Sequence, residues 1–417
     1  MKNNFYNLLF TNLFIALIAL LSFNGCSDKG APSLYQGIPT TPIGATPSIS
    51  SINPPNTSVA GVTQLTITGK NFSTNPLEDL VYFNITQAVV VSATPTQLVV
   101  NAPNVVSDSI TVMVAVVHSE LFSNKLYYNL TPAAKDFYPN SKFTIPYSVV
   151  SDNIGNIYSS TTLNGVGNGI TKITPDSVVA PYASRGTETF WTSMRFGPNG
   201  VLYAARNLYA VFQIPAGGGA PTTFVVLPSS LKISQLEFDA NNNLWAGGNN
   251  TAIYRIKQDK SLKSYPFTAN ITAMRVYNDG GTSYLYVAAQ QDSNVTVQRF
   301  PIDANGDLGT PQLYFDFSGN YGVGNSITSL EFSSDGDMYL GTNLPEAIVL
   351  VHKDKSSSFL YPGVLAETGA LSMVWGSGNF LYYIRSQVLD PNTGSVIIPQ
   401  TIVKLNIQKP GAPYYGR

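Results

Sequence analysis

Cysteine is almost absent from this chain of 417 residues, since Cys26 is the only one. No disulfide can form within one chain, and zinc sites built from several cysteines are excluded. Charge is also scarce, because Asp, Glu, Lys and Arg make up 11% of the residues and the formal net charge is −1. Without a basic surface the chain has no electrostatic means of holding a phosphate backbone, so we expect no nucleic-acid partner.

Histidine and the common catalytic motifs are equally scarce. Only His118 and His352 occur, and each stands alone just after a predicted strand, where a turn residue is the simpler interpretation. The sequence has no nucleophile elbow, no phosphate-binding loop and no dinucleotide fingerprint. These shortages favour a binding or scaffolding protein over an enzyme. We predict no catalytic residue, no bound metal and no cofactor.

Apolar and turn-forming residues are abundant. Hydrophobic residues make up 44% and aromatic residues 12% of the chain, with 34 Gly and 27 Pro. Such a composition supports large cores, many turns and few helices. The sequence therefore predicts an all-β protein of more than one domain.

The first 46 residues resemble an export signal and a tether. Lys2 precedes an apolar run at 8–21, which is too short for a membrane span of about 20 residues. Phe23-Asn24-Gly25-Cys26 resembles the lipobox of bacterial lipoproteins, although Leu is commoner at the first position and Ala or Ser at the second. This resemblance implies a signal peptide at 1–25, a lipid on Cys26, and a tether at 26–46. Ordinary signal cleavage beside an incidental cysteine is the alternative.

The expected location follows from that anchor. A lipid on Cys26 would make the membrane a partner and place the chain at the outer membrane, facing the periplasm or the cell surface. Ser27-Asp28 has a weak similarity to the export signals of surface lipoproteins. The Ser-, Gly-, Pro- and Thr-rich tether would keep the folded part off the membrane surface.

Residues 47–131 predict a small β-sandwich. About seven short alternating segments follow one another, separated by turns, among them 62–69 and 110–117. The stretches ISSINP at 49–54 and LTITGKNF at 65–72 resemble the IPT/TIG immunoglobulin-like domain. The resemblance implies the fold more firmly than a role, and we expect a spacer rather than a dimerisation module or a ligand contact.

Residues 135–417 contain six repeats of one β-hairpin. Each repeat carries an aromatic residue in its second strand, and the six are Tyr158, Tyr203, Trp245, Tyr286, Tyr339 and Tyr382, at intervals of 45, 42, 41, 53 and 43 residues. A period near 45 with several strands per unit predicts a six-bladed β-propeller with four strands per blade. The shared aromatics are interpreted as packing between blades rather than as a sugar-binding ladder.

The repeats resemble NHL and related propeller repeats, including the streptogramin-lyase-like group. The shared pattern, Gly-Asn-Leu followed by an aromatic and later by Ile-x-Arg/Lys-Ile, covers all six units and marks a scaffold. Either residues 135–138 or residues 413–415 complete the last blade, and both remain open. The whole chain is thus predicted to be an immunoglobulin-like β-sandwich followed by a six-bladed β-propeller.

Loops at one end of a propeller usually carry its function. On that basis we predict a polar face that binds a glycan or protein ligand through hydrogen bonds and stacking. Its candidate residues are Trp191, Tyr321, Arg185, Glu188, Tyr209, Asn249, Asp292 and Arg385. Neighbouring loop residues of the same kind are Asn250, Gln291, Asn343 and Asp390.

A metal-dependent lyase or lactonase is the rival interpretation. The lyase resemblance implies a histidine base, but only His352 lies in the propeller. A lactonase-like site would need oxygen ligands, for which Asp152, Asn153, Asn249 and Asp292 are the candidates. Residues 303–307 (DANGD) are similar to a calcium loop but lack its later glutamate, so we predict a turn there.

Overall fold

The computed structural model describes residues 44–138, 144–186, 190–228 and 230–416. The predicted signal peptide, Cys26 and residues 26–43 of the predicted tether lie outside the described residues. Helix is limited within the described part to α2 (Phe317–Tyr321) and one 3-10 turn, η1 (Pro198–Gly200). No helix among these residues is long and apolar enough to cross a membrane. The expectation of an all-β chain is confirmed.

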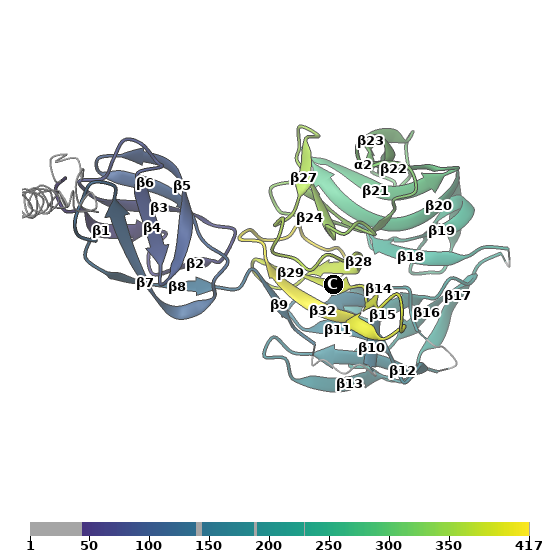
Figure 1. Cartoon of the computed structure of the whole chain (residues 1–417). Helices are drawn as coiled ribbons and strands as arrows, with labels where there is room; N and C mark the ends of the chain where they lie inside the picture. The colour runs from purple at the N-terminus through teal and green to yellow at the C-terminus, as the bar shows by residue number, and fades with distance from the viewer. Residues whose placement is uncertain (1–43, 139–143, 187–189, 229, 417) are drawn as a thin grey trace, which may run out of the picture.

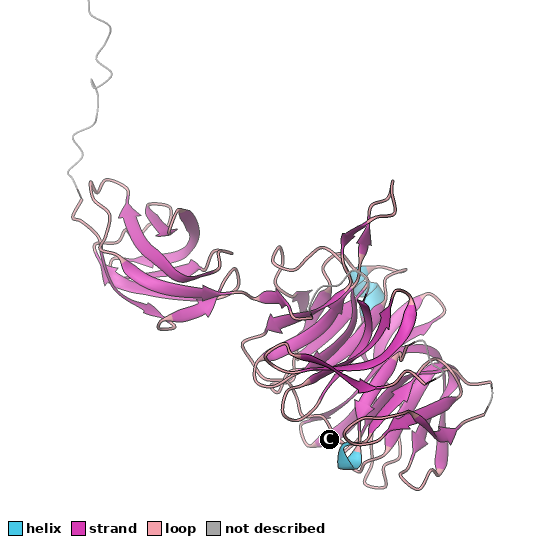
Figure 2. Cartoon of the chain, turned by 90° about the horizontal axis from the view of Figure 1, so that it is seen from below, coloured by secondary structure: helices cyan, strands magenta, loops and turns pink. Residues whose placement is uncertain are grey.

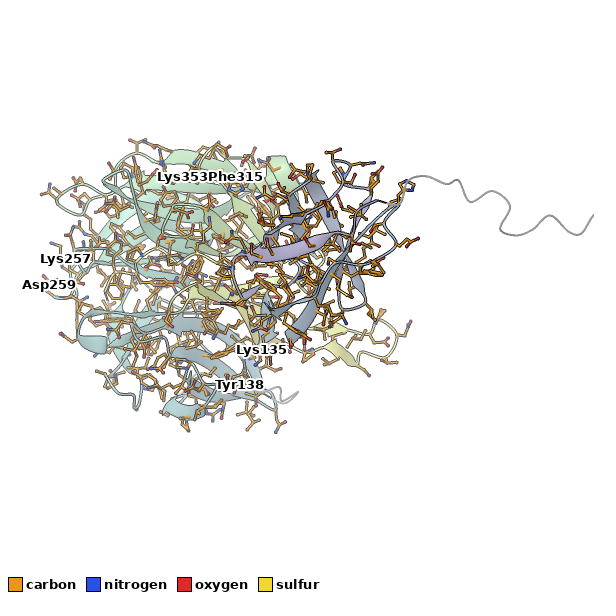
Figure 3. The ribbon with its side chains drawn as sticks, turned by 90° about the vertical axis from the view of Figure 1, so that its left-hand side faces the viewer. Lys135, Tyr138, Lys257, Asp259, Phe315 and Lys353 are labelled. Atoms are coloured by element: carbon orange, nitrogen blue, oxygen red, sulfur yellow. The ribbon has the colours of Figure 1, made fainter. Side chains whose placement is uncertain are left out.

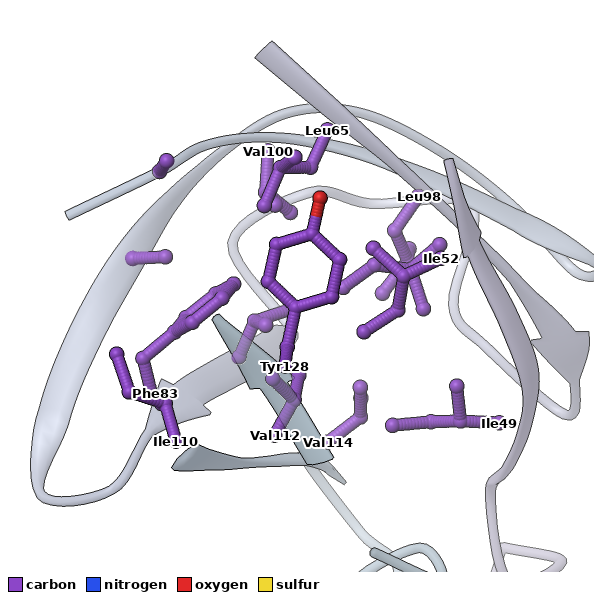
Figure 4. Close-up of a cluster of buried hydrophobic side chains, with 14 of the residues drawn as sticks. Ile49, Ile52, Leu65, Phe83, Leu98, Val100, Ile110, Val112, Val114 and Tyr128 are labelled. Carbon is purple, nitrogen blue, oxygen red and sulfur yellow. The ribbon is translucent and has the colours of Figure 1, made fainter. Parts of the chain in front are cut away.

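The N-terminal domain is the predicted β-sandwich. Its strands hydrogen-bond in the order β1-β3-β6-β5-β4-β7-β8-β2. Alternation places Leu65 and Ile67 wholly inside, while the hydroxyl of Tyr128 crosses the core to donate to the carbonyl of Pro54 at 2.7 Å (Figure 4). The strands are β1 (Ser48–Asn53), β2 (Thr57–Val59), β3 (Gln64–Lys70), β4 (Asp79–Phe83), β5 (Thr86–Thr94), β6 (Gln97–Asn101), β7 (Ser107–Val116) and β8 (Leu126–Thr131).

The C-terminal domain is a propeller-like ring of small antiparallel sheets (Figure 1). Two four-stranded sheets come first, β10-β11-β12-β13 and β14-β15-β16-β17, and a six-stranded sheet, β18 to β23, follows. The strands of these sheets are β10 (Thr144–Ser151), β11 (Ile157–Leu163), β12 (Val166–Ile173), β13 (Val179–Ala183), β14 (Ser193–Phe196), β15 (Leu202–Ala205), β16 (Ala210–Ile214), β17 (Thr222–Val226), β18 (Ile233–Phe238), β19 (Leu244–Ile256), β20 (Leu262–Asp279), β21 (Thr282–Gln291), β22 (Asn294–Pro301) and β23 (Gln312–Asp316).

Two further four-stranded sheets complete the ring. Their orders are β24-β25-β26-β27 and β28-β29-β32-β9, so the last sheet takes its outer strand from the beginning of the domain. A separate two-stranded hairpin, β30 with β31, rises between β29 and β32. The strands are β24 (Ile327–Phe332), β25 (Met338–Thr342), β26 (Ile348–Val351), β27 (Ser357–Phe359), β28 (Ala370–Trp375), β29 (Phe380–Arg385), β30 (Val388–Leu389), β31 (Val396–Ile398), β32 (Thr401–Asn406) and β9 (Ala134–Asp136).

The prediction of six separate four-stranded sheets needs a correction. The described residues form five sheets around the ring, because the third and fourth repeats share the six-stranded one. Strand β20 is the cause: residues 262–270 pair with β19 and residues 270–279 pair with β21, so no loop interrupts the ladder between the two repeats. Strand β20 is rich in Thr, Val and Tyr, which favour extended backbone. The strand therefore continues through the expected boundary between the third and fourth repeats.

The innermost strand of each repeat lies against those of its neighbours. Strands β10, β14, β18, β20, β24 and β28 touch in that order, and β28 touches β10 to close the circle. We call these the inner strands; in β20 the part concerned is residues 270–279. Every inner strand is an edge of its own sheet on the side of the axis, so its free amides need partners from the neighbouring sheet.

Ring closure uses the strand directly after the sandwich. β9 pairs with β32, and the Arg385 guanidinium holds the Asp136 carboxylate at 3.0 Å. Of the two candidates left open by the sequence, the segment at 135–138 therefore completes the last sheet. The segment at 413–415 lies elsewhere, across one end of the ring.

The sandwich and the ring are closely joined. Only Pro132 and Ala133 separate β8 from β9, and Ala133 is 2% exposed. Thr63 of the sandwich also donates to the side chain of Gln408 at 3.0 Å. Figure 3 shows Lys135 at this junction, well separated from Lys257 and Asp259 at the rim of the ring. The sandwich lies beside the ring and leaves both of its ends uncovered (Figures 1 and 2).

The six repeated aromatics are packing residues, as predicted. Each is between 0% and 5% exposed. Trp245 illustrates how the neighbouring turn assists, because its indole N–H donates at 3.0 Å to the Asp239 carboxylate. The same carboxylate accepts the amides of Asn241 and Asn243. The polar turn therefore serves the fold rather than a ligand.

Candidate functional site

The two aromatic candidates from the sequence do not face a shared site. Trp191 is 1% exposed, and its ring packs against Phe212 with centroids 5.1 Å apart. Tyr321 is half-buried at the end of α2, where its hydroxyl donates to Ser357 at 2.9 Å and its ring stacks on Phe317. In this structure neither ring is presented as an open stacking platform.

The polar candidates are spread around one end of the ring. Tyr209 is 40% exposed between β15 and β16. Asn249 is exposed within β19, Asp292 is exposed in the turn between β21 and β22, and Arg185 is exposed after β13. Arg385 holds Asp136 in the closing sheet, and Glu188 lies outside the described residues. The described candidates share an end of the ring but are spread over four of its sheets, with Asn249 and Asp292 on the same one.

We define that end as the open end: it is where the second and third strands of each repeat are joined. The register places it at the start of the inner strands, since Ile233 pairs with Gly248 and Gln235 with Gly247, next to Asn249. The opposite end carries the turns between first and second strands, such as 239–243. The two sets of turns are thus separated by the length of the strands.

The oxygen ligands proposed for a lactonase-like metal site do not meet. Asp152 and Asn153 lie in the turn between β10 and β11, whereas Asn249 and Asp292 lie at the open end. Over the described residues, no three His, Cys, Asp or Glu side chains are grouped so that they could hold a metal ion. His352 reaches only Asp337, with Nδ1 and Oδ1 3.2 Å apart.

Residues 303–307 form the predicted turn. The Asp303 carboxylate accepts the amides of Asn305 and Asp307 at 2.9 and 2.8 Å. Lys263 and Tyr265 donate to the carboxylate of Asp307 and lower its pKa to about 2, with Arg255 adding to the effect. These oxygens are engaged by protein donors rather than arranged for a cation.

A small polar cavity occupies the axis of the ring near the open end. Its volume is about 40 Å³, and every inner strand contributes to its wall. The equivalent wall positions are Ser148, Ser193, Gln235, Ala273, Ser329 and Ser372. Leu371, one residue nearer the open end, also lines it and is 37% exposed, which marks the side where the cavity meets solvent.

The serines of this wall join neighbouring sheets. The hydroxyl of Ser193 accepts the amide of Leu236 at 3.1 Å, and that of Ser329 accepts the amide of Met373 at 2.9 Å. The hydroxyl of Ser372 likewise accepts the amide of Val149 at 3.3 Å. Each serine thus satisfies an edge amide that its own ladder leaves unpaired.

Below the cavity, four charged side chains form a buried chain of ion pairs. Arg195 Nε lies 2.9 Å from Glu237 Oε2, Arg275 Nη1 lies 3.5 Å from Glu237 Oε1, and Arg275 Nε lies 3.0 Å from Glu331 Oε2. The last three side chains are 0–1% exposed, and Arg195 is 13% exposed. All four lie two residues beyond the cavity wall in their strands.

Burial shifts the pKa values of the side chains in these ion pairs. Burial alone lowers the pKa of Arg275, but Glu237 and Glu331 outweigh it, so the net pKa is raised and the guanidinium stays charged. Burial raises the pKa of Glu331, and Arg275 with Arg195 offsets only part of that rise. The cationic members of the chain are therefore held more firmly in their charged form than Glu331 is.

The segment at 410–416 covers the other end of the axis. The amide of Ala412 donates to the carbonyl of Phe332, and Arg275 Nη2 donates to the carbonyl of Pro413 at 3.0 Å. The Arg275 guanidinium also lies 3.9 Å from the ring centroid of Tyr414, whose hydroxyl accepts the amide of Trp375 at 2.8 Å. This end is therefore sealed.

Removing the Tyr414 ring is expected to loosen the seal. Tyr414→Ala deletes the stacking on Arg275 and leaves a gap, so we expect the free energy of unfolding to fall by about 2–3 kcal/mol. Tyr414→Phe keeps the ring and loses the hydroxyl, which accepts the Trp375 amide and interacts with Glu331, so we expect a loss of about 1–2 kcal/mol. Urea unfolding followed by tryptophan fluorescence measures both. Equal losses in the two variants would contradict a role for the ring.

A signal for these residues was present in the sequence. Four inner strands place a charge two residues after the wall position, in the order Arg195, Glu237, Arg275 and Glu331. Polar residues at alternate positions of a strand normally face solvent. The pattern by itself therefore predicts that these four side chains are exposed. Their meeting on one axis depends on the closed ring.

Comparisons with known proteins agree with this fold. Residues 47–132 match the IPT/TIG domain family. A luciferin-regenerating enzyme of known structure has 13% identity and a TM-score of 0.51, with 68% of this chain and 98% of that chain covered. An auxiliary nutrient binding protein from Bacteroides thetaiotaomicron has 11% identity, coverage of 87% and 97%, and a TM-score of 0.49.

A second auxiliary nutrient binding protein, from Bacteroides ovatus, has 9% identity, coverage of 87% of this chain and 98% of that chain, and a TM-score of 0.47. No curated protein sequence matches the chain. At 13% identity, the similarity to the luciferin-regenerating enzyme shows the fold alone and leaves ligand and activity to be argued from the site itself.

Proposed function

We propose that this protein is a lipid-anchored bacterial lipoprotein of the outer membrane whose ring is a non-catalytic binding head for a glycan or protein ligand. In this proposal the ring is an NHL-like propeller, with each of the six sequence repeats supplying one inner strand. The ligand binds at the open end.

The difference between the two ends carries the proposal. At the open end a polar cavity lies on the axis, and the exposed side chains of Tyr209, Asn249 and Asp292 lie at the same end, outside the inner strands. At the other end the segment at 410–416 covers the axis. A ligand that uses the axis therefore has access from one side. Loops on a rigid scaffold are the usual place for recognition.

A hairpin at the open end adds apolar contact area. Strands β30 and β31 stand away from the ring (Figure 2), and Leu389, Val396 and Ile397 are 45%, 48% and 60% exposed. The hairpin thereby presents three apolar side chains to solvent. It gives the open end a mixed polar and apolar character that suits a protein chain or a sugar ring.

The sandwich is proposed to act as a spacer. Two residues link it to the closing strand of the ring, and its first strand, β1, begins at Ser48, where the predicted tether ends. It thus lies between the predicted anchor on Cys26 and the binding head. Because it sits beside the ring, it leaves the open end accessible.

Binding at the open end is tested with the full mature chain made soluble by Cys26→Ser. An array of neutral and acidic oligosaccharides, followed by titration of the best binder, is the measurement. We expect saturable binding that weakens at least about tenfold in the double variant Tyr209→Ala, Asp292→Ala, because truncating a central contact costs about 2 kcal/mol or more.

Matched control variants lie at the sealed end. Asn153 and Ile154 are exposed there, and Ile154 is 71% exposed. Asn153→Ala and Ile154→Ala are expected to leave the affinity unchanged. Binding that is lost in these variants and kept in the open-end variant would place the ligand at the wrong end and overturn the proposed site.

A further inference from the structure

The cavity on the axis is lined by hydrogen-bond donors that have no acceptor. The oxygens of Ser193, Ser329 and Ser372 already accept backbone amides from the neighbouring inner strand. A hydroxyl that accepts one bond still has its own proton to donate. Among the described residues none of these three hydroxyls donates to a protein acceptor. Their protons are therefore available to whatever occupies the cavity.

Arg195 adds a charged donor to the same wall. Its Nε donates to Glu237 at 2.9 Å, and its Nη1 donates to the carbonyl of Met194 at 3.0 Å. Its Nη2 has no acceptor within the described part of the chain, and Arg195 lines the cavity with 13% of its side chain exposed. It is the accessible member of the buried ion-pair chain.

The acceptors that line the cavity are neutral. No Asp or Glu lines it, and the side chain of Gln235, which does, makes no hydrogen bond among the described residues. A water or a neutral hydroxyl can pair with the serine hydroxyls, but it brings no negative charge to the Arg195 guanidinium. A carboxylate brings only acceptors, with about four lone-pair sites on two oxygens. Charged acceptors also form the stronger hydrogen bonds.

We propose that this cavity receives a carboxylate group carried by the ligand. The inference rests on the proposed function, because it names the chemistry of a ligand bound at the open end. The volume of about 40 Å³ is more than the roughly 10–15 Å³ that a single water needs, so the cavity can hold a group of a few atoms such as a carboxylate. An acidic sugar and an acidic peptide both offer such a group.

The electrostatics of the floor agree with an anion. The buried ion pairs beneath the cavity comprise two arginines and two glutamates, but burial pushes Glu331 towards its neutral form. Any such shift leaves an excess of positive charge beneath the cavity. A carboxylate at Arg195 then compensates charge in a place that water reaches poorly, where electrostatic interactions are strong.

Matched probes test the inference on the soluble full chain. Methyl glucuronide is compared with methyl glucoside, and an acetylated peptide ending in a free carboxylate is compared with its amide, by calorimetric titration. We expect at least about tenfold tighter binding of the carboxylated member in one of the two pairs. The pair that shows the difference identifies the source as a sugar or a peptide. Equal binding within both pairs, or no binding of either carboxylated probe, overturns the inference.

Gln235→Glu places a negative charge in the cavity with almost no change of shape. We expect it to weaken carboxylate binding at least about tenfold, whereas Gln387→Glu, at an exposed position of the same end, leaves it unchanged. Ser329→Ala removes one donor and is expected to weaken binding about threefold. If Gln235→Glu fails to fold, Ser329→Ala with unaltered carboxylate affinity overturns the inference.

The two proposals fail in different ways. Neutral oligosaccharides that bind at the open end, lose affinity in the Tyr209→Ala, Asp292→Ala variant and ignore Gln235→Glu would refute the carboxylate and leave the binding head intact. Carboxylate binding that is insensitive to both open-end and cavity variants refutes both.

Discussion

Replacing Arg275 by Met is expected to lower the free energy of unfolding of the ring by about 3–5 kcal/mol. Arg275 is wholly buried and contacts both Glu237 and Glu331. Its loss leaves Glu331 as a buried charge with no cation in contact. It also removes the donors to Ala412 and Pro413, so the sealing segment loses its main polar attachment.

Tryptophan fluorescence reports this effect selectively. All three tryptophans, Trp191, Trp245 and Trp375, belong to the ring and are 0–1% exposed, so unfolding of the sandwich does not contribute. The control is Arg299→Met. Arg299 pairs with Asp279 where the two side chains are 25% and 43% exposed, and its guanidinium lies 4.4 Å from the ring centroid of Tyr284, so its loss is expected to cost about 1–2 kcal/mol.

A compensated variant separates charge from packing. Arg275→Met together with Glu331→Leu removes one buried pair and leaves Arg195 with Glu237 intact. Because apolar residues can replace a buried ion pair at little cost, we expect most of the lost stability to return. If the single Arg275→Met variant loses no more than the Arg299→Met control, the buried chain is not a major contributor to stability.

Changing Cys26 to Ser is expected to release the protein from the membrane completely. The proposed lipid can be attached only to Cys26, since the chain has no other cysteine. Among the described residues no helix offers a second means of spanning a membrane. Fractionation of cells into membrane and soluble material, with fatty-acid labelling of the purified chain, measures the effect.

The neighbouring serine provides the control for this experiment. Ser27→Ala keeps the thiol and is expected to stay in the membrane fraction with its label. An unlabelled parent chain, or a Cys26→Ser chain that keeps the fatty-acid label, would contradict lipidation of Cys26. Ordinary signal cleavage beside an incidental cysteine predicts a parent chain that is unlabelled and released. The proposed function would then need another route to the cell surface.

The sandwich and the ring were readable from local patterns. Alternation in 62–69 predicted the buried pair Leu65 and Ile67, and both are 0% exposed. The repeated aromatics likewise predicted where the sheets pack. Such patterns can be recognised in a sequence because successive side chains of a strand point to opposite faces. This period of two does not depend on which distant segments pack against the strand.

The candidate site was readable only in part. Tyr209, Asn249 and Asp292 lie together at one end of the ring, as expected, because loop position follows from the order of strands; their role in binding stays a prediction. Trp191 has the chemistry of a stacking residue, yet its ring lies in the core beside Phe212. Burial of a loop-adjacent aromatic depends on how neighbouring sheets approach, which a single segment does not encode.

From the sequence alone came the all-β class, the two domains, the repeat and the predicted anchor, since each depends on residues close together in the chain. The tertiary structure decided three other features: the merging of two repeats through β20, the closure of the ring by β9, and the meeting of Arg195, Glu237, Arg275 and Glu331 on one axis. The charged residues are 38 to 56 positions apart from one to the next. Only a closed ring brings such distant positions into contact, because each inner strand then lies beside the next and their equivalent side chains share one narrow space.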